Sequence, residues 1–336
     1  MSQDSYIKKV AIVGATGTVG SFIVDELIKL GKHEITAITR KSSSAANSIP
    51  EGVKVAKVDY DEESTLVDGL KGQDALIITM DTRAAPDTQS KLIRAAAAAN
   101  VPFVLPNEWG CDTADEALGK DILIGDIKVS SRKLIEELGK SSWIGVVTGF
   151  WYEYSLGFGK ETYGMEWKTR TWTFFDNGET KMNTTTWPQV GRAVTKLLSL
   201  PIEPEKEGAP NLSSYKNKFV YVSSFHLSQK DMFAAVLRAT GTKESDWKIE
   251  YEESDKRFQD ARKRLFGGET QAYPQLLYSR VFRDGSNDFV GKYGTVANDV
   301  LGLPKEDLDE ATKRAIDRAE KGLKYHQARH QDRHIS

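Results

Sequence analysis

The chain has 336 residues, of which 39% are hydrophobic and 28% are charged, a composition typical of a globular protein that buries a sizeable core. Its formal net charge of −2 excludes a global positive field that would hold nucleic acid or an anionic membrane, so we expect neither as a partner. The one cysteine, Cys111, excludes an intrachain disulfide, and the polar N-terminus lacks the apolar core of a signal peptide, which together favour a cytoplasmic location.

Short apolar runs alternate with helical patterns through the first 150 residues. Strands that alternate with helices form parallel sheets with helices on both faces, joined by right-handed crossovers. The pattern therefore predicts an α/β fold with a doubly wound parallel sheet of the Rossmann type. The expected strands are 10–14, 34–39, 53–58, 75–79, 103–106 and 143–148, and the expected helices are 19–30, 63–70, 88–100 and 126–138.

The rhythm changes after about Gly149, where residues 149–175 contain ten aromatics. We therefore divide the chain into a first domain, residues 1–150, and a smaller α+β lobe, residues 151–336. As an alternative, the helix expected at 187–200 packs back on the first domain. Three further elements are expected: a strand entering a tight turn at 174–178, a strand at 219–223, and a helix from the capping box at 228–231 to about 240.

Three glycines spaced three apart join the first strand to the first helix. In a dinucleotide-binding loop, Gly14 would permit the tight turn, Gly17 would let a pyrophosphate approach the backbone, and Gly20 would let the helix pack on the strand. A helix N-terminus also offers free N–H groups and partial positive charge to phosphates. A plain glycine turn is the alternative, but the position between a strand and a helix favours dinucleotide binding. The expected cofactor contacts are Gly14, Thr16, Gly17, Thr18, Val19 and Gly20.

The end of the second strand indicates which dinucleotide is bound. An NAD-binding domain usually carries Asp or Glu there, about 20 residues past the loop. This chain has Arg40 and Lys41 instead, whose cations suit a 2′-phosphate. Two solvated cations are the alternative, but the missing acid favours NADP(H) and an NADP-binding first domain. Asp59, which follows the third strand, is expected near the adenine.

Two segments later in the chain resemble a known family. No tyrosine is followed by lysine four residues on, which argues against ordinary short-chain dehydrogenase chemistry. Instead VPFVLPNEWG (101–110) and GDIKVSSRKLIEEL (125–138), together with GATGTVG, are similar to the NmrA-like, isoflavone-reductase-like branch of atypical short-chain dehydrogenases. That branch includes isoflavone, pinoresinol-lariciresinol and phenylcoumaran benzylic ether reductases and NmrA-type regulators. The resemblance covers roughly residues 8–240.

The matching positions carry specific expectations. PNEWG stands where plant reductases have Pro-Ser-Glu-Phe-Gly, and Lys128 matches the lysine of a Lys-x-x-x-Arg-Arg helix. From spacing alone Lys128 would be solvated, because it flanks the apolar stripe of its helix. The resemblance implies instead that it reaches the nicotinamide and the substrate as general acid or base. It also implies cofactor contacts at Thr79, Met80, Asn107 and Glu108, and substrate contacts at Trp109, Phe150, Trp151 and Tyr152.

The sequence departs from the plant pattern at Asn107, Trp109 and Lys133, where the reductases carry serine, phenylalanine and arginine. Fold and cofactor therefore carry over, whereas the substrate does not. The leading hypothesis is an NADPH-dependent reductase of a small aromatic or conjugated metabolite, as in secondary metabolism, with hydride from nicotinamide C4 and Lys128 handling the proton. An NmrA-type NADP-binding regulator without catalysis and a cofactor-assisted isomerase are the alternatives. A homodimer is a further hypothesis.

Three weaker patterns remain. The aromatic residues after Gly149 either build a pocket for a flat apolar substrate or form the core of the lobe. Cys111 has no histidine nearby in sequence and is interpreted as an inert buried thiol rather than a nucleophile. His326, His330 and His334 would share one helix face and could bind a metal, but the polar terminal segment favours a solvated tail, so no metal site is expected.

Overall fold

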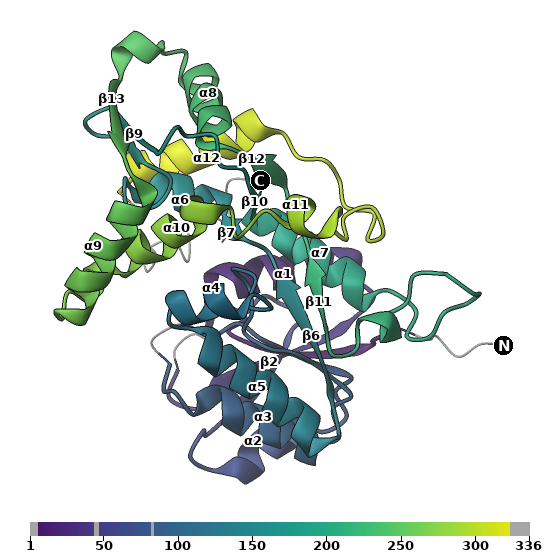
Figure 1. Ribbon diagram of the computed structural model, residues 1–336. Helices are drawn as coiled ribbons and strands as arrows, with labels where there is room; N and C mark the ends of the chain where they lie inside the picture. Colours follow the sequence, from purple (N-terminus) through teal and green to yellow (C-terminus); the bar gives the residue numbers. More distant parts are fainter. Residues whose placement is uncertain (1–5, 44–46, 82–83, 323–336) are drawn as a thin grey trace.

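A parallel sheet of seven strands forms the centre of the larger layer (Figure 1). Its strand order is β11-β6-β5-β4-β1-β2-β3. The computed structural model describes residues 6–43, 47–81 and 84–322. All pairings in this sheet are parallel. Its strands are β1 (Lys9–Val13), β2 (Glu34–Arg40), β3 (Lys54–Val58), β4 (Ala75–Ile78), β5 (Phe103–Leu105), β6 (Ser142–Val147) and β11 (Lys218–Tyr221).

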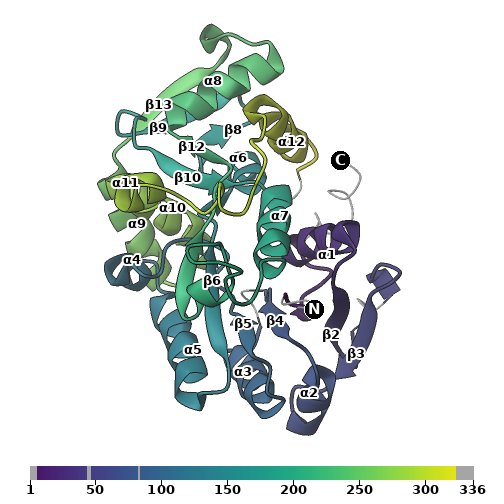
Figure 2. The ribbon, with the colours of Figure 1, turned by 90° about the vertical axis from the view of Figure 1, so that its right-hand side faces the viewer.

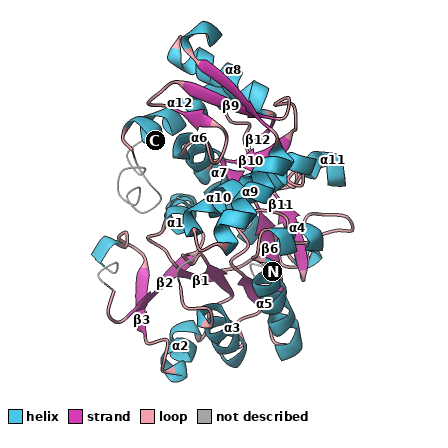
Figure 3. Cartoon of the chain, turned by 60° about the vertical axis from the view of Figure 1, so that its left-hand side comes forward, coloured by secondary structure: helices cyan, strands magenta, loops and turns pink. Residues whose placement is uncertain are grey.

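Helices cover both faces of this sheet (Figure 3). Because side chains of a strand alternate between faces, Val10 and Ile12 of β1 enter one core, whereas Ala11 and Val13 enter another. The fold is therefore doubly wound α/β, as the alternation of elements predicts. The first core includes α1 (Thr18–Leu30) and α7 (Trp187–Leu198), and the second includes α2 (Glu63–Leu70), α3 (Thr88–Ala98) and α5 (Gly125–Leu138).

Two elements that follow residue 150 belong to this layer. Helix α7 packs on α1, and the approach is so close that a Cβ on Gly191 would lie 2.3 Å from the Phe22 carbonyl oxygen. Strand β11 pairs with β6 and completes one edge of the sheet. The chain thus leaves the sheet, enters the lobe and returns, and a cut at residue 150 would separate α7 and β11 from the layer that they complete.

The smaller lobe lies on the sheet layer, as Figure 2 shows from the side, and contains two three-stranded sheets, β12-β10-β7 and β13-β9-β8. Helix α12 packs against α6 and α8. The strands of the lobe are β7 (Phe150–Trp151), β8 (Met165–Glu166), β9 (Thr171–Phe175), β10 (Met182–Thr185), β12 (Phe225–Leu227) and β13 (Lys248–Glu252). The remaining helices are α4 (Glu116–Asp121), α6 (Tyr152–Phe158), α8 (Gln229–Thr240), α9 (Ser254–Phe266), α10 (Tyr273–Asp284), α11 (Phe289–Tyr293) and α12 (Leu308–Glu320).

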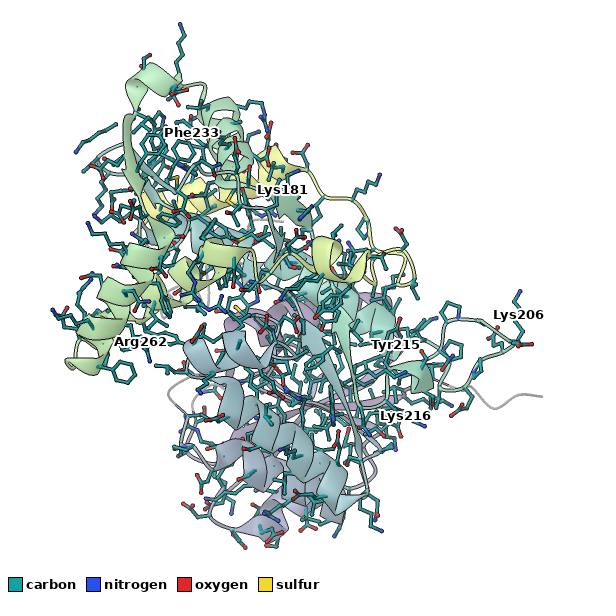
Figure 4. All side chains as sticks on the ribbon, in the orientation of Figure 1. Lys181, Lys206, Tyr215, Lys216, Phe233 and Arg262 are labelled. Atoms are coloured by element: carbon teal, nitrogen blue, oxygen red, sulfur yellow. The ribbon has the colours of Figure 1, made fainter. Side chains whose placement is uncertain are left out.

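Aromatic side chains fill the core of the lobe. Phe233 of α8, labelled in Figure 4, has its ring centroid 4.9 Å from that of Trp172 in β9. Tyr163 and Phe175 are also fully buried in this core. Lys206, in contrast to these buried side chains, lies at the tip of a loop that projects from the sheet layer (Figure 4). Most of the aromatic block after Gly149 therefore builds the lobe itself, which was one of the two interpretations of that block.

Candidate functional site

The glycine loop connects β1 to α1 at the carboxyl end of the sheet. Gly14 has φ +81°, and a Cβ there would lie 1.9 Å from the Thr79 carbonyl oxygen. A Cβ on Gly20 would lie 2.1 Å from the Gly14 carbonyl oxygen. Neither position tolerates a side chain, because the turn and the helix pack directly on the backbone of the neighbouring strand ends. A Cβ on Gly17 would meet only the Gly14 oxygen, at 3.1 Å.

The N-terminus of α1 is open to an anion. The Gly17 N–H donates to the Gly14 carbonyl at 2.8 Å, which closes the loop. No side chain among the described residues caps this end, and the first turn holds no acidic residue. The N–H groups of Thr18, Val19 and Gly20 belong to the first turn, which has no intrahelical acceptors of its own. This arrangement suits phosphate oxygens, which accept from such groups and interact favourably with the helix dipole.

Arg40 and Lys41 follow at the end of β2, where both side chains are exposed. The Lys41 ammonium lies 3.5 Å from the Glu62 carboxylate, and both side chains are more than half exposed, so this ion pair holds the lysine only weakly. Burial raises the pKa of the Tyr60 phenol, and the nearby Arg40 cation opposes that shift. Asp59 uses one carboxylate oxygen to accept the Asp61 N–H at 3.0 Å, so it shapes the turn after β3.

Asn107 ties the ends of β4 and β5 together. Its side-chain oxygen accepts the Met80 N–H at 3.2 Å, and its side-chain nitrogen donates to the Met80 carbonyl at 3.3 Å. Its own N–H donates to Gln89 Oε1 at 2.9 Å. Thr79 is fixed in turn, since its N–H and hydroxyl both donate to the Val13 carbonyl. Asn107 therefore fixes the backbone beside the glycine loop.

Glu108 is almost completely buried, with 1% of its side chain exposed. One carboxylate oxygen accepts from Arg132 at 2.5 Å, and the other accepts the Thr113 hydroxyl at 2.8 Å. The Lys128 ammonium lies 3.6 Å from the second oxygen. Two cations and a hydroxyl therefore surround this carboxylate, which makes the burial of its charge tolerable.

Lys128 itself is mostly buried, with 14% of its side chain exposed. Its ammonium donates to the Glu108 carbonyl at 2.5 Å. The expectation from spacing alone, a solvated lysine, is therefore wrong, because the loop 106–110 folds over this face of α5. Burial raises the pKa of the Cys111 thiol to about 11, and the Asn287 side chain and the positive charge of Lys128 oppose that shift.

Of the four residues expected to contact the substrate, three are buried in the protein core and one is partly exposed. Trp109 is 6% exposed and donates its indole N–H to the Ile78 carbonyl at 2.7 Å, within the core of the sheet layer. Phe150 stacks on Tyr278 with ring centroids 3.8 Å apart, inside the lobe. The Tyr152 hydroxyl pairs with that of Thr312 at 2.8 Å, also in the lobe.

Trp151 differs from both of its neighbours. It remains partly exposed and packs against the core that contains Ala15 and Val19 of the glycine loop. Because successive residues of an extended segment point to opposite sides, Phe150 and Tyr152 face the lobe while Trp151 faces the sheet layer. Of the four expected substrate contacts, Trp151 is the one that stays partly exposed.

Sequence reasoning missed several polar residues at this edge. Thr113 and Gln89 hold Glu108 and Asn107, and Asp112 accepts hydrogen bonds from the hydroxyls of Tyr221 and Tyr293. Asn287 contacts Cys111 from a turn far along the chain. No spacing rule links these residues, although Lys128 and Arg132, four apart on one helix, signal a shared partner.

Two negative findings concern the described residues. Within 6–43, 47–81 and 84–322, no group of three or more His, Cys, Asp or Glu side chains could hold a metal ion. His326, His330 and His334 lie outside the described residues. None of the described helices is long and apolar enough to cross a membrane.

Comparison with known proteins yields one family match. The model of the NmrA-like family matches residues 7–253. A protein of Aspergillus flavus named "Oxidoreductase aprR" is 29% identical over 309 residues, covering 90% of this chain and 96% of that protein. Quinone oxidoreductase 2 of Escherichia coli is 32% identical over 139 residues, which are 40% of this chain and 48% of the enzyme.

Solved structures show the same fold. A structure from a study of pinoresinol-lariciresinol and phenylcoumaran benzylic ether reductases superposes with a TM-score of 0.70 at 20% identity, over 92% of this chain and 99% of that chain. Triphenylmethane reductase of Citrobacter, solved with NADP(H), superposes with a TM-score of 0.65 at 16% identity, over 91% of this chain and 99% of that enzyme.

Proposed function

This chain belongs to the NmrA-like family, and on that premise we propose that it is an NADPH-dependent reductase of a small aromatic or conjugated metabolite. The observation that carries the proposal is the Lys128 ammonium, mostly buried at the carboxyl edge of the same sheet whose β1 bears the glycine loop. The relatives named as oxidoreductases support the same conclusion.

The residues at this edge fit a dinucleotide with a 2′-phosphate. The glycine loop and the first turn of α1 offer N–H groups to a pyrophosphate without a competing carboxylate. Arg40 and Lys41 offer two exposed cations at the end of β2. Thr79, Met80 and Asn107 line the neighbouring strand ends, and we retain them as contacts to the middle and nicotinamide end of the cofactor. Glu108 contributes to cofactor binding through the backbone of the loop 106–110, because its carboxylate already binds Arg132 and Thr113.

When bound, NADPH supplies a hydride, so this chain must supply a proton. The Lys128 ammonium uses one N–H on the Glu108 carbonyl and lies 3.6 Å from the Glu108 carboxylate, which leaves one of its three N–H groups for a substrate atom. After giving up a proton, the amine regains one from water, which reaches it through its exposed fraction. Arg132 and Thr113 hold Glu108 in place, and this fixes the position of the ammonium.

The substrate class is inferred from the one expected substrate contact that stays partly exposed. Trp151 packs against the core of the sheet layer, with Trp187 as a ring neighbour, and an aromatic side chain at this position suits a flat aromatic molecule. Neighbouring structures contain pinoresinol or belong to an enzyme named for triphenylmethane dyes, both aromatic. Trp109, Phe150 and Tyr152 shape this region from within the two cores rather than by an exposed surface. A cytoplasmic location and a homodimer complete the proposal, and sedimentation would test the dimer.

The test is consumption of NADPH, followed by absorbance, with a panel of quinones, conjugated ketones, imines and benzylic ethers. We expect turnover of at least one class and a loss of roughly 10²–10⁴-fold in kcat for Lys128→Ala. Lys133→Ala is the matched control, because that lysine is exposed on the same helix, and it should leave kcat unchanged. Wild-type kcat in Lys128→Ala would remove the lysine from the reaction. Tight NADPH binding without turnover of any panel member would favour the regulator instead.

A further inference from the structure

The cationic end of β2 lies beside an acidic turn. Lys41 directly follows Arg40, and its N–H donates to the Val58 carbonyl at 2.9 Å, so its backbone is paired with the end of β3. The turn after β3, residues 59–63, carries four carboxylates: Asp59, Asp61, Glu62 and Glu63. The acidic turn is therefore next to the two cations that we expect to contact the 2′-phosphate of the cofactor.

Glu62 is the acid of this turn that meets Lys41. One oxygen of its carboxylate lies 3.5 Å from the Lys41 ammonium, within reach of a hydrogen bond. Asp61 instead lies 3.1 Å from the Lys91 ammonium of α3, and Asp59 accepts the Asp61 N–H. The second cation of the pair at β2 thus already faces an anion of the protein itself.

The backbone of Glu62 is fixed at the start of α2. Its N–H donates to the Asp59 carbonyl at 3.1 Å, and its carbonyl accepts the N–H and the hydroxyl of Thr65 at 3.0 and 2.8 Å. Its carboxylate also accepts the Ser64 hydroxyl at 3.3 Å. The carboxylate therefore projects from a well-defined turn, and it stays near Lys41 unless these hydrogen bonds break.

A 2′-phosphate that binds at Arg40 and Lys41 meets this carboxylate in one of two ways. If the ammonium turns from Glu62 to the phosphate, the ion pair is lost on binding. If the ammonium contacts both groups, two anions share one cation and repel each other. Both arrangements weaken the binding of NADPH. Neither affects NADH, because that cofactor has no 2′-phosphate.

We propose that Glu62 competes with the 2′-phosphate of NADPH for the Lys41 ammonium and thereby lowers the preference of the protein for NADPH over NADH. The proposal rests on the function proposed above, in which Arg40 and Lys41 contact that phosphate. Both partners of the ion pair are more than half exposed, so water and salt screen it. The effect on the Kd should therefore be about two- to fivefold, the range that exposed ion pairs reach.

Two variants separate this ion pair from the general negative charge of the turn. Glu62→Gln removes the charge and keeps the volume, and the Glu62 side chain makes no capping hydrogen bond with α2 that would be lost. Glu63→Gln is the matched control, because it removes the same charge one residue further on, in the first turn of α2, where Glu63 is exposed. Both variants should fold like the wild type, since surface substitutions of this kind change stability little.

The readout is the Kd for NADPH, measured by calorimetry, and the Kd for NADH, measured by competition. We expect Glu62→Gln to lower the Kd for NADPH about two- to fivefold and to leave the Kd for NADH within about 1.5-fold of the wild type. Glu63→Gln should leave both values within about 1.5-fold. In 1 M KCl, where the Debye length is about 3 Å, the effect of Glu62→Gln should shrink.

A double variant tests whether Glu62 acts through Lys41. In Lys41→Met no ammonium remains for which the two anions could compete. We therefore expect Glu62→Gln to change the Kd for NADPH less than half as much in that background, measured as a ratio, as in the wild type. Such non-additivity is typical of residues that contact each other.

The proposal is overturned by a fall of less than twofold in the Kd for NADPH in Glu62→Gln, or by an equal fall for NADH or in Glu63→Gln. An undiminished effect in the Lys41→Met background would contradict it as well. The reductase function is judged separately, by turnover. If Glu62→Gln binds NADPH more tightly but no member of the substrate panel is reduced, the reductase is refuted while the role of Glu62 stands.

Discussion

The glycine loop and the Lys128 site lie at one edge of one sheet, but they are assembled in opposite ways. The glycine loop is contiguous, and Gly14, Gly17 and Gly20 act through the space that their missing side chains leave. The Lys128 site draws on α5 and the loop after β5, and it depends on charged groups that bury one another. The glycine loop should therefore be disrupted by an added side chain, and the Lys128 site by removal of one partner of a buried ion pair.

The largest effect is expected at Gly20. Gly20→Ala places a Cβ 2.1 Å from the Gly14 carbonyl oxygen, so backbone must move, and we expect a loss of about 4 kcal/mol or more in the free energy of unfolding. Gly17→Ala is the comparison, because its Cβ meets that oxygen only at 3.1 Å. It should stay within about 1 kcal/mol of wild type in urea unfolding while weakening NADPH binding. Equal stability losses in the two variants would contradict the assigned roles.

The buried charges give the next effect. Arg132→Met keeps apolar contact with Phe219 and Trp143 but leaves the Glu108 carboxylate without its closest cation. We expect a loss of roughly 3–5 kcal/mol in unfolding free energy. The double variant Glu108→Gln with Arg132→Met should recover part of that loss, because no carboxylate then remains buried. Strictly additive losses in urea titrations would show that the pair does not interact.

The cofactor's 2′-phosphate provides a smaller and more selective effect. Arg40→Ala removes one exposed cation at the end of β2, and we expect the Kd for NADPH to rise about 10- to 100-fold, as charge-assisted hydrogen bonds imply. The Kd for NADH should not change, and this cofactor is the internal control. A parallel weakening of both cofactors in fluorescence titrations would place Arg40 elsewhere than at the phosphate.

Cys111 gives the smallest effect, and it depends on pH. Burial raises its pKa in the folded protein from the usual 9.0 to about 11, so the thiol favours the folded state below pH 9 and loses that contribution as the pH rises through 11. At pH 10 the loss relative to pH 7 is on the order of 1 kcal/mol. Unfolding of wild type and Cys111→Ala should therefore show a stability difference that shrinks between pH 9 and 11. A constant difference over that range would mean that the thiol titrates normally.

Local rules predicted the glycine loop, the alternation of elements and the cationic end of β2, because each of these features is encoded within a few consecutive residues. The same rules left Lys128 solvated, since helical spacing does not reveal which loop covers a helix face. The cofactor contact expected at Glu108 stays a prediction, whereas the partners of its carboxylate, Thr113 and Arg132, lie 5 and 24 residues away and were not predicted. Asn287 is 176 residues from Cys111, a separation that only the folded chain closes.

The return of the chain to the sheet was predicted only as an alternative, in which the helix expected at 187–200 packs back on the first domain. Trp187 and the proline after it indicate where α7 begins, but they do not decide between the lobe and the first domain as its partner. The feature that fixes its place is Gly191, which meets α1 at the Phe22 carbonyl. A glycine within a helix is destabilising relative to alanine unless it permits close packing. Gly191 was therefore the residue in the sequence that could have indicated a close contact with another helix.

The most direct test of the account is calorimetric titration of NADPH and NADH into the purified wild-type protein. The account predicts a Kd for NADPH at least tenfold below that for NADH, because the glycine loop holds the shared pyrophosphate while Arg40 and Lys41 hold the additional phosphate. Tighter binding of NADH, or no heat from either cofactor, would contradict it.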